Sequence, residues 1–189
     1  MTEVAWLPRE ELTEDDLALM PDDGHRYEII DGSLVVSPPP SSGHQLIAAR
    51  LSRLLAMHAP GGCEVLEGVG VRAGRHWSSL LIPDVAVVSA DEARKDVPAF
   101  DPHHVSLVVE VVSRSSVTMD RVTKPSLYAT ARIPSFWRIE RDHPAGVMIA
   151  VHELEGETYR LASELVGTIE HQLDEPFPLP IRPADLLLP

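Results

Sequence analysis

Two near-continuous apolar runs, at residues 80–88 and 105–112, constrain the fold of this chain more than any other feature. Such a run is typical of a central β-strand covered on both faces, because an exposed face would require polar residues at alternate positions. The 189 residues suffice for one domain with a substantial core. The sequence therefore predicts a mixed α/β (α+β) fold, in which helices flank a central mixed β-sheet.

Local signals predict the elements around these strands. Residues 1–20 resemble a helix in which Thr13 can cap an acidic turn, and Asp31 with Gly32 predicts a β-hairpin. A capped amphipathic helix follows, with its apolar face formed by Leu46, Ile47, Leu51, Leu54 and Leu55. The remaining expectations are a strand at 65–71, a loop at 91–104, a helix at 116–132, and a hairpin of 147–152 with 158–162. We expect a single domain over 1–189, its core spanning about 8–165 and its Pro-rich tail, 173–189, lying on the surface.

Each apolar run contains one carboxylate, Asp84 in the first and Glu110 in the second. An ionised carboxylate away from water costs on the order of several kcal/mol, so it requires a metal, a cation or a raised pKa. If the two strands are neighbours, both carboxylates can meet on one face and offer the oxygen ligands that Mg²⁺ or Mn²⁺ prefers. The alternatives are an exposed strand end or an arginine partner for Glu110, and a simple turn after Pro83 for Asp84.

Lys124 is the third candidate. Asp120, Lys124 and Tyr128 follow one another at a spacing of four residues, which places them on one helical face. An exposed Asp120–Lys124 salt bridge explains this spacing without any function. Alternatively, the Lys124 amine points back at the carboxylates and stabilises negative charge on a phosphoryl group. Pro125 is tolerated only near a helix start or a kink, so a helix beginning near Lys124 competes with a continuous one.

An ordered set of motifs carries a family resemblance. Its members are Arg26-Tyr-Glu-Ile-Ile-Asp-Gly, His44 in the first long helix, Pro83-Asp-Val-Ala-Val-Val, Leu107-Val-Val-Glu-Val-Val-Ser, Asp120-Arg-Val-Thr-Lys with Tyr128-Ala, and Ile133-Pro-Ser-Phe-Trp. Each motif is weak alone, but the ordered set is fairly specific. Over roughly residues 8 to 165 it resembles the Uma-type family of candidate restriction endonucleases, within the PD-(D/E)XK nuclease superfamily.

The resemblance implies a restriction-endonuclease-like fold and metal-dependent cleavage of DNA. Asp84 and Glu110 would bind Mg²⁺ or Mn²⁺, and Lys124 would act beside them. The superfamily usually places its lysine two residues after the second acid, where this chain has Val112, whereas the family supplies the lysine from the next helix. Glu28 matches an N-terminal acid that completes the catalytic set, although its alternation with apolar neighbours also fits a position facing solvent.

Two departures from the family pattern affect the helix that carries the lysine. Ser113-Arg114-Ser115 stands where Ser-Pro-Ser is common, and Pro125 stands where a basic residue is usual. His44, although it matches the family, is of a type that lies more often on a helix surface than at a ligand site. Phosphate-binding glycine loops and Gly-x-Ser-x-Gly elbows are absent from the sequence.

The net charge of −13 conflicts with a nucleic-acid substrate, because phosphate binding depends on basic surface. An asymmetric charge distribution or bound divalent cations would reconcile the two. Two alternatives therefore stay open beside a DNA endonuclease: a nuclease fold retained as a binding or regulatory module without turnover, and a hydrolase of another phosphate ester.

Cellular context and assembly follow from weaker signals. The apolar runs are too short to span a membrane, no signal peptide is evident, and the lone Cys63 cannot form an internal disulfide. We therefore expect a cytoplasmic protein without a membrane partner. By analogy with nucleases of this fold, we expect a homodimer.

Overall fold

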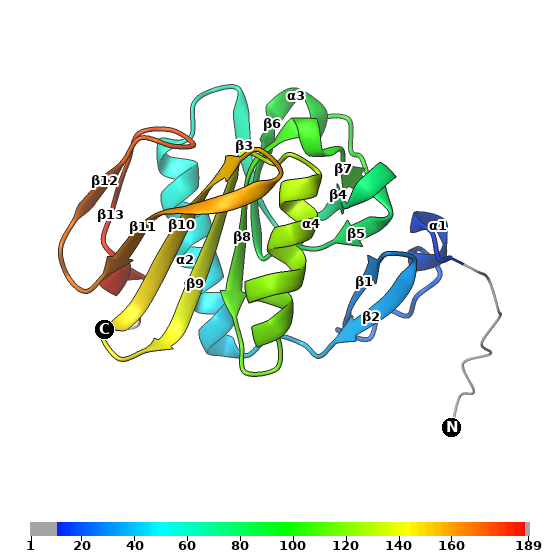
Figure 1. Ribbon diagram of the computed structural model, residues 1–189, viewed down its shortest axis with the longest axis horizontal. Helices are drawn as coiled ribbons and strands as arrows, with labels where there is room; N and C mark the ends of the chain where they lie inside the picture. The colour runs from blue at the N-terminus through cyan, green and yellow to red at the C-terminus, as the bar shows by residue number, and fades with distance from the viewer. Residues whose placement is uncertain (1–10, 188–189) are drawn as a thin grey trace.

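A six-stranded sheet forms the centre of the computed structural model, which describes residues 11–187 (Figure 1). Its strand order is β11–β10–β9–β8–β6–β3; β8 and β9 run parallel, and the other neighbouring pairs run antiparallel. The strands are β3 (Cys63–Glu67), β6 (Val85–Ser89), β8 (Val105–Val112), β9 (Ser135–His143), β10 (Gly146–Glu155) and β11 (Thr158–Val166). The two apolar runs thus supply the neighbouring strands β6 and β8, and the β10–β11 hairpin is confirmed.

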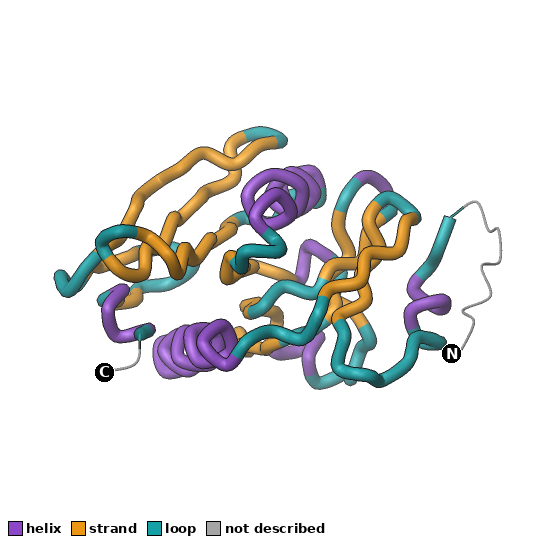
Figure 2. Tube along the Cα trace, turned by 90° about the horizontal axis from the view of Figure 1, so that it is seen from below, coloured by secondary structure: helices purple, strands orange, loops and turns teal. Residues whose placement is uncertain are grey.

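Helices cover both faces of this sheet, with α2 (Ser42–His58) on one side and α4 (Lys124–Thr130) on the other (Figure 2). Ser41 caps α2, and the helix buries Ile47 and Leu51 against the sheet. Leu46 was expected on this face but is 37% exposed, so the buried stripe is narrower than the sequence suggested.

The predicted helix at 116–132 consists of two pieces. A π-helical turn at Met119–Thr123 leads directly into α4, which begins at Lys124. Pro125 has no backbone N–H to donate, so an ordinary α-helical hydrogen-bond ladder cannot run through this point. Irregular turns of this kind are frequent near functional sites because they change the direction of a side chain.

A second, five-stranded sheet has the order β2–β1–β5–β4–β7. Its strands are β1 (Arg26–Ile30), β2 (Ser33–Ser37), β4 (Gly70–Ala73), β5 (Ser79–Leu81) and β7 (Ala99–Phe100). The predicted hairpin is confirmed: Asp31 and Gly32 join β1 to β2 with φ of 46° and 74°. Positive φ at both central residues suits the twist of a tight hairpin.

Two runs predicted as single strands are in fact divided between the two sheets. Residues 65–71 split at Gly68, which has a φ of 64°, and residues 80–88 split at Ile82-Pro83-Asp84. Apolar residues continue on both sides of each break, so hydropathy alone could not reveal the change of sheet. Asp84 consequently lies in the short connection where the chain passes from one sheet to the other.

Both ends of the described chain differ from expectation. The tail packs into the core: β12 (His171–Leu173) pairs with β13 (Leu179–Ile181), and Phe177, Leu179 and Ile181 are buried beside α2. Prolines alternate with these apolar residues, so the extended chain turns every apolar side chain inward. The N-terminal helix is short: α1 (Glu14–Leu17) is capped by Thr13 with Asp16, and residues 1–10 lie outside the described part.

The segment at 91–104 is less irregular than expected. Its first three residues belong to the short helix α3 (Ala90–Ala93). The segment then continues into β7 and ends in a 3₁₀ turn at Pro102–His104. Across residues 11–187, we find no helix both long and apolar enough to cross a bilayer.

Candidate active site

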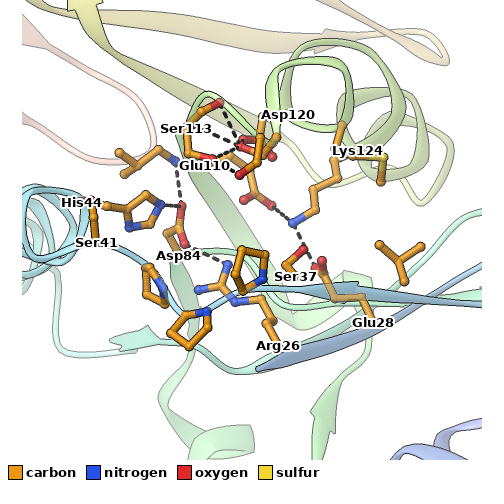
Figure 3. A pocket seen from close by; sticks show the side chains of 18 of the residues that line it. Arg26, Glu28, Ser37, Ser41, His44, Asp84, Glu110, Ser113, Asp120 and Lys124 are labelled. Atoms are coloured by element: carbon orange, nitrogen blue, oxygen red, sulfur yellow. Dashed lines mark hydrogen bonds and ion pairs between the residues drawn. The ribbon is translucent and has the colours of Figure 1, made fainter. Parts of the chain in front are cut away.

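The structure brings Asp84, Glu110, Lys124 and Glu28 together around one cavity of about 460 Å³ (Figure 3). Asp84 precedes β6, and Glu110 lies on the neighbouring strand β8, with Val85 opposite Val109 in the register. Glu28 comes from β1 of the second sheet, so both sheets contribute walls. Lys124 reaches in from the first residue of α4. All four side chains are 5% exposed or less.

Asp84 is surrounded by hydrogen-bond donors. Arg26 Nη1 lies 2.9 Å from Oδ1, while His44 Nε2 and the backbone N–H of Val111 lie 3.1 and 2.7 Å from Oδ2. Burial alone would raise the pKa of Asp84, but the His44 hydrogen bond, the Arg26 charge and the Val111 N–H together lower it. The structure therefore holds Asp84 as a carboxylate.

Glu110 has a contrasting environment. Its Oε1 accepts a hydrogen bond from the Tyr128 hydroxyl at 2.7 Å and lies 3.0 Å from Lys124 Nζ. Burial raises the pKa of Glu110 well above its ordinary value; Lys124 opposes the shift, and the charges of Asp120, Asp84 and Glu28 reinforce it. Glu110 is thus a buried acid among other acids.

The Lys124 ammonium lies between two carboxylates. Its Nζ is 2.9 Å from Glu28 Oε1 and 3.0 Å from Glu110 Oε1. Burial would lower the pKa of Lys124, but the charges of Glu110 and Glu28 outweigh burial and raise it. The amine is therefore a fixed cation inside the cavity. The exposed Asp120–Lys124 salt bridge is absent from the described residues, because Lys124 is buried and pairs with Glu28 and Glu110 instead.

Asp120 is a fourth buried acid, which the sequence suggested only as a surface partner of Lys124. It is 3% exposed, lines the cavity, and accepts a short hydrogen bond from the Ser116 hydroxyl. Burial raises its pKa to about 6, against the opposing effects of Lys124 and Ser116. Asp120 is the buried residue of the π-helical turn, which directly precedes Lys124.

Comparison of the sequence and the fold with known proteins assigns the chain to a family. Residues 14–183 match the Uma2 family, described as "Putative restriction endonuclease". The chain belongs to the Uma2 family. A solved structure from Anabaena variabilis ATCC 29413, described as "a putative nuclease belonging to DUF820", is 14% identical, with a TM-score of 0.65. The match covers 93% of this chain and 97% of that one, which confirms the nuclease-like fold. None of the curated proteins matches the chain.

Two residues of this Uma2 protein contact Asp84 although sequence reasoning gave them no role. Arg26 alternates with Glu28 along β1, a period of two that places both on one face, so this signal was available. His44 was expected at the helix surface but is 7% exposed and lines the cavity. Its position in the first turn of α2, directly after the cap, aims it at the strand ends, and only the tertiary fold reveals this.

Charge and donor type in the Uma2 cavity fit a divalent cation. Among the described residues that line it, four carboxylates, from Glu28, Asp84, Glu110 and Asp120, face two fixed cations, Arg26 and Lys124. Excess negative charge away from water is relieved by a divalent ion with oxygen ligands. Within residues 11–187, however, no three His, Cys, Asp or Glu side chains already form a ligand cluster. Binding would therefore require side chains to rearrange.

Proposed function

We propose that the protein hydrolyses phosphodiester bonds of DNA, with Mg²⁺ or Mn²⁺ held by Asp84 and Glu110. The observation that carries this proposal is the buried Lys124 ammonium, fixed beside an excess of carboxylates in a cavity that opens to solvent. Membership of the Uma2 family supports a nuclease. When bound, the divalent ion would act as a Lewis acid on a phosphoryl oxygen.

Lys124 supplies positive charge where negative charge develops on the reacting phosphate. Glu28 keeps the amine in place, because its Oε1 also accepts the backbone N–H of Ile82 at 2.7 Å and cannot move freely. Arg26 and His44 orient Asp84 from two sides. Such positioning groups matter because a displacement of about 1 Å can cost roughly a hundredfold in rate.

A plasmid-cleavage assay with Mg²⁺, Mn²⁺ or EDTA tests the proposal. Asp84→Asn, Glu110→Gln and Lys124→Met should each slow cleavage by roughly a hundredfold or more, the usual loss when a group that stabilises developing charge is removed. Glu153→Gln and Lys95→Met are matched controls, because both side chains form exposed ion pairs and should cut as wild type does. Circular dichroism checks the fold of each variant.

Wild-type rates in all three site variants would overturn the site assignment, and full activity in EDTA would overturn metal dependence. Hydrolysis of a simple phosphate monoester without plasmid cleavage would instead identify a hydrolase of another phosphate ester. Sedimentation at several concentrations tests the homodimer that we propose by analogy with this fold.

A binding or regulatory module without turnover is the second candidate function. It is favoured because both oxygens of Asp84 already accept hydrogen bonds, so a metal ion would have to compete for them. Calorimetric titration with Mg²⁺ and Mn²⁺ separates the two functions. Absence of binding at millimolar metal, together with absence of cleavage, would favour the module; metal binding that Asp84→Asn abolishes would favour the nuclease.

A further inference from the structure

An arginine without an acidic partner in the described part of the chain contacts a residue that lines the catalytic cavity. Arg141, on β9, donates from Nη1 to the Ser41 hydroxyl at 3.1 Å, and Ser41 lines the cavity. No carboxylate among residues 11–187 forms an ion pair with Arg141. In a chain with 29 acidic and 16 basic residues, a guanidinium left unneutralised beside an active site suggests an anionic partner.

The start of α2 adds backbone donors beside this guanidinium. Arg141 Nη2 lies across the first turn of the helix, 3.3 Å from where a Cβ on Gly43 would be. The first N–H groups of a helix have no acceptor within it, and helix N-termini attract phosphate. This helix is 17 residues long, and its third residue, His44, is 7% exposed, with no hydrogen-bond partner for Nδ1 among the described residues. The backbone N–H groups of the helix start and the positive charge of Arg141 therefore coincide here.

A second arginine lies on the neighbouring loop, where the chain leaves β8. Arg114 stands between Ser113 and Ser115, which both line the cavity, and its side chain is 95% exposed. Its ion pair with Asp142 is long, at 3.7 Å, and Asp142 is itself 72% exposed. Exposed pairs of this kind are worth little, so a phosphate can displace Asp142. β8 and β9 run parallel with Val112 opposite Glu140, so Arg114 and Arg141 follow at the same edge of the sheet.

We propose that this arginine edge, formed by Ser41, Ser42, Gly43, Arg114 and Arg141, binds a backbone phosphate that flanks the scissile phosphate of the DNA strand. The inference rests on the proposed function and deepens it by assigning the substrate contact outside the catalytic groups. It also accounts for substrate binding by a chain of net charge −13, because the two arginines lie where the DNA strand would enter the cavity.

The test measures DNA binding without turnover. Fluorescence anisotropy follows a fluorescein-labelled duplex and the matching single strand, titrated with full-length protein in EDTA and in Ca²⁺ over a series of KCl concentrations. Arg114→Gln/Arg141→Gln should weaken binding about tenfold or more and reduce the slope of log Kd against log[salt] by about 1, since each neutralised phosphate contributes roughly 0.9 to the slope and the edge binds one phosphate. Arg141→Lys should keep the salt slope but lose part of the affinity, because lysine lacks the planar fork.

Arg50→Gln/Arg53→Gln is the matched control. Both arginines lie on α2, line a different pocket and have no carboxylate ion pair within the described residues. This pair should bind DNA as wild type does. Equal weakening by both double variants, unchanged binding by Arg114→Gln/Arg141→Gln, or absence of wild-type binding in EDTA and in Ca²⁺ would each overturn the arginine edge.

The two proposals fail separately. If the wild type binds DNA through Arg114 and Arg141 but cuts no substrate, the proposed function falls and the arginine edge stands as a contact to the DNA backbone. If the wild type cuts DNA and Arg114→Gln/Arg141→Gln binds and cuts equally well, the edge falls and the function stands.

Discussion

Asp84, just before β6, and Glu110, on the adjacent strand β8, face one cavity, yet the charges that surround them differ in sign. Asp84 is contacted by a guanidinium, an imidazole and a backbone N–H, and its pKa is lowered. Glu110 is buried among other carboxylates with one ammonium and one phenol as partners, and its pKa is raised. Both are about equally inaccessible to solvent, so burial alone does not decide the charge of a buried acid.

The difference divides the cavity into two halves. The Asp84 half is electrically satisfied, whereas the half containing Glu110, Asp120 and Glu28 carries more carboxylate than its single ammonium neutralises. A ligand of positive charge therefore gains more from the second half. Variants that strengthen or erase this contrast test it.

Lys124→Met should have the largest effect on stability. It leaves Glu28 and Glu110 buried without their cation, and removal of one member of a buried pair costs about 3–5 kcal/mol. The loss should shrink as pH falls, because protonated carboxyl groups no longer need the ammonium. Urea unfolding at pH 8 and pH 5 measures it. Lys95→Met, which removes an exposed pair, should stay within about 1 kcal/mol; an equal loss in both variants would contradict the argument.

Asp120→Asn should stabilise the protein in EDTA. The folded pKa of about 6 lies above the ordinary value of 3.8, so the wild type carries an unfavourable charge above pH 6 and none below pH 4. The variant should gain about 3 kcal/mol at pH 8, a gain that disappears near pH 4. Urea unfolding across this range checks the sign, with the exposed Asp91→Asn as control. A loss of stability at pH 8 would refute the assignment.

Arg26→Gln should make Asp84 resemble Glu110. Removing the guanidinium raises the pKa of Asp84 and costs about 2 kcal/mol at neutral pH, the usual contribution of a hydrogen bond to a charged group. Because the wild-type pKa is lowered, this stabilisation is present above the unfolded value and is lost as pH falls through the folded one. Carbon-detected NMR of the Asp84 carboxyl follows the titration. Arg72→Gln, a partly buried arginine outside the cavity, should leave that titration unchanged.

Tyr128→Phe should give the smallest effect, about 1–2 kcal/mol, since it removes one donor to Glu110. Tyr159→Phe is matched to it, because that hydroxyl donates to the neutral carbonyl of Ile133 at 2.8 Å. The gap between the two variants should widen as pH rises and Glu110 ionises. Identical pH profiles in thermal unfolding would mean that the phenol does not sense the charge of Glu110.

The fold could be predicted wherever local pattern and burial agree. The strand at 105–112 was predicted with its observed bounds, and the hairpin at Asp31 and Gly32 follows from turn chemistry. The run at 80–88 could not be divided correctly, because a hydropathy pattern records burial but not which sheet provides it. The buried tail was missed for a related reason: its prolines suggested a surface segment while their spacing allowed an inward face.

The candidate site was predictable in its acids but not in their partners. A carboxylate within an apolar strand is costly, so Glu110 and Asp84 stood out in the sequence. The partners of Asp84 come from other elements. Arg26 lies 58 residues earlier in the sequence, and His44 lies in the first turn of α2. Such interactions depend on packing between elements, which no local pattern encodes. Likewise, the four-residue spacing of Asp120 and Lys124 fitted an exposed pair, whereas the fold buries both side chains.

Lys124 also has a mechanical role. Glu28 belongs to the five-stranded sheet and Glu110 to the six-stranded one. The Lys124 ammonium forms an ion pair with each of them and so links the two sheets inside the cavity. When the Lys124–Glu28 ion pair breaks, the β1–β2 hairpin loses a contact to the six-stranded sheet's side of the cavity, and the Lys124 ammonium is no longer held in place. Local opening between the two sheets and loss of the cation in the candidate site are therefore expected to occur together.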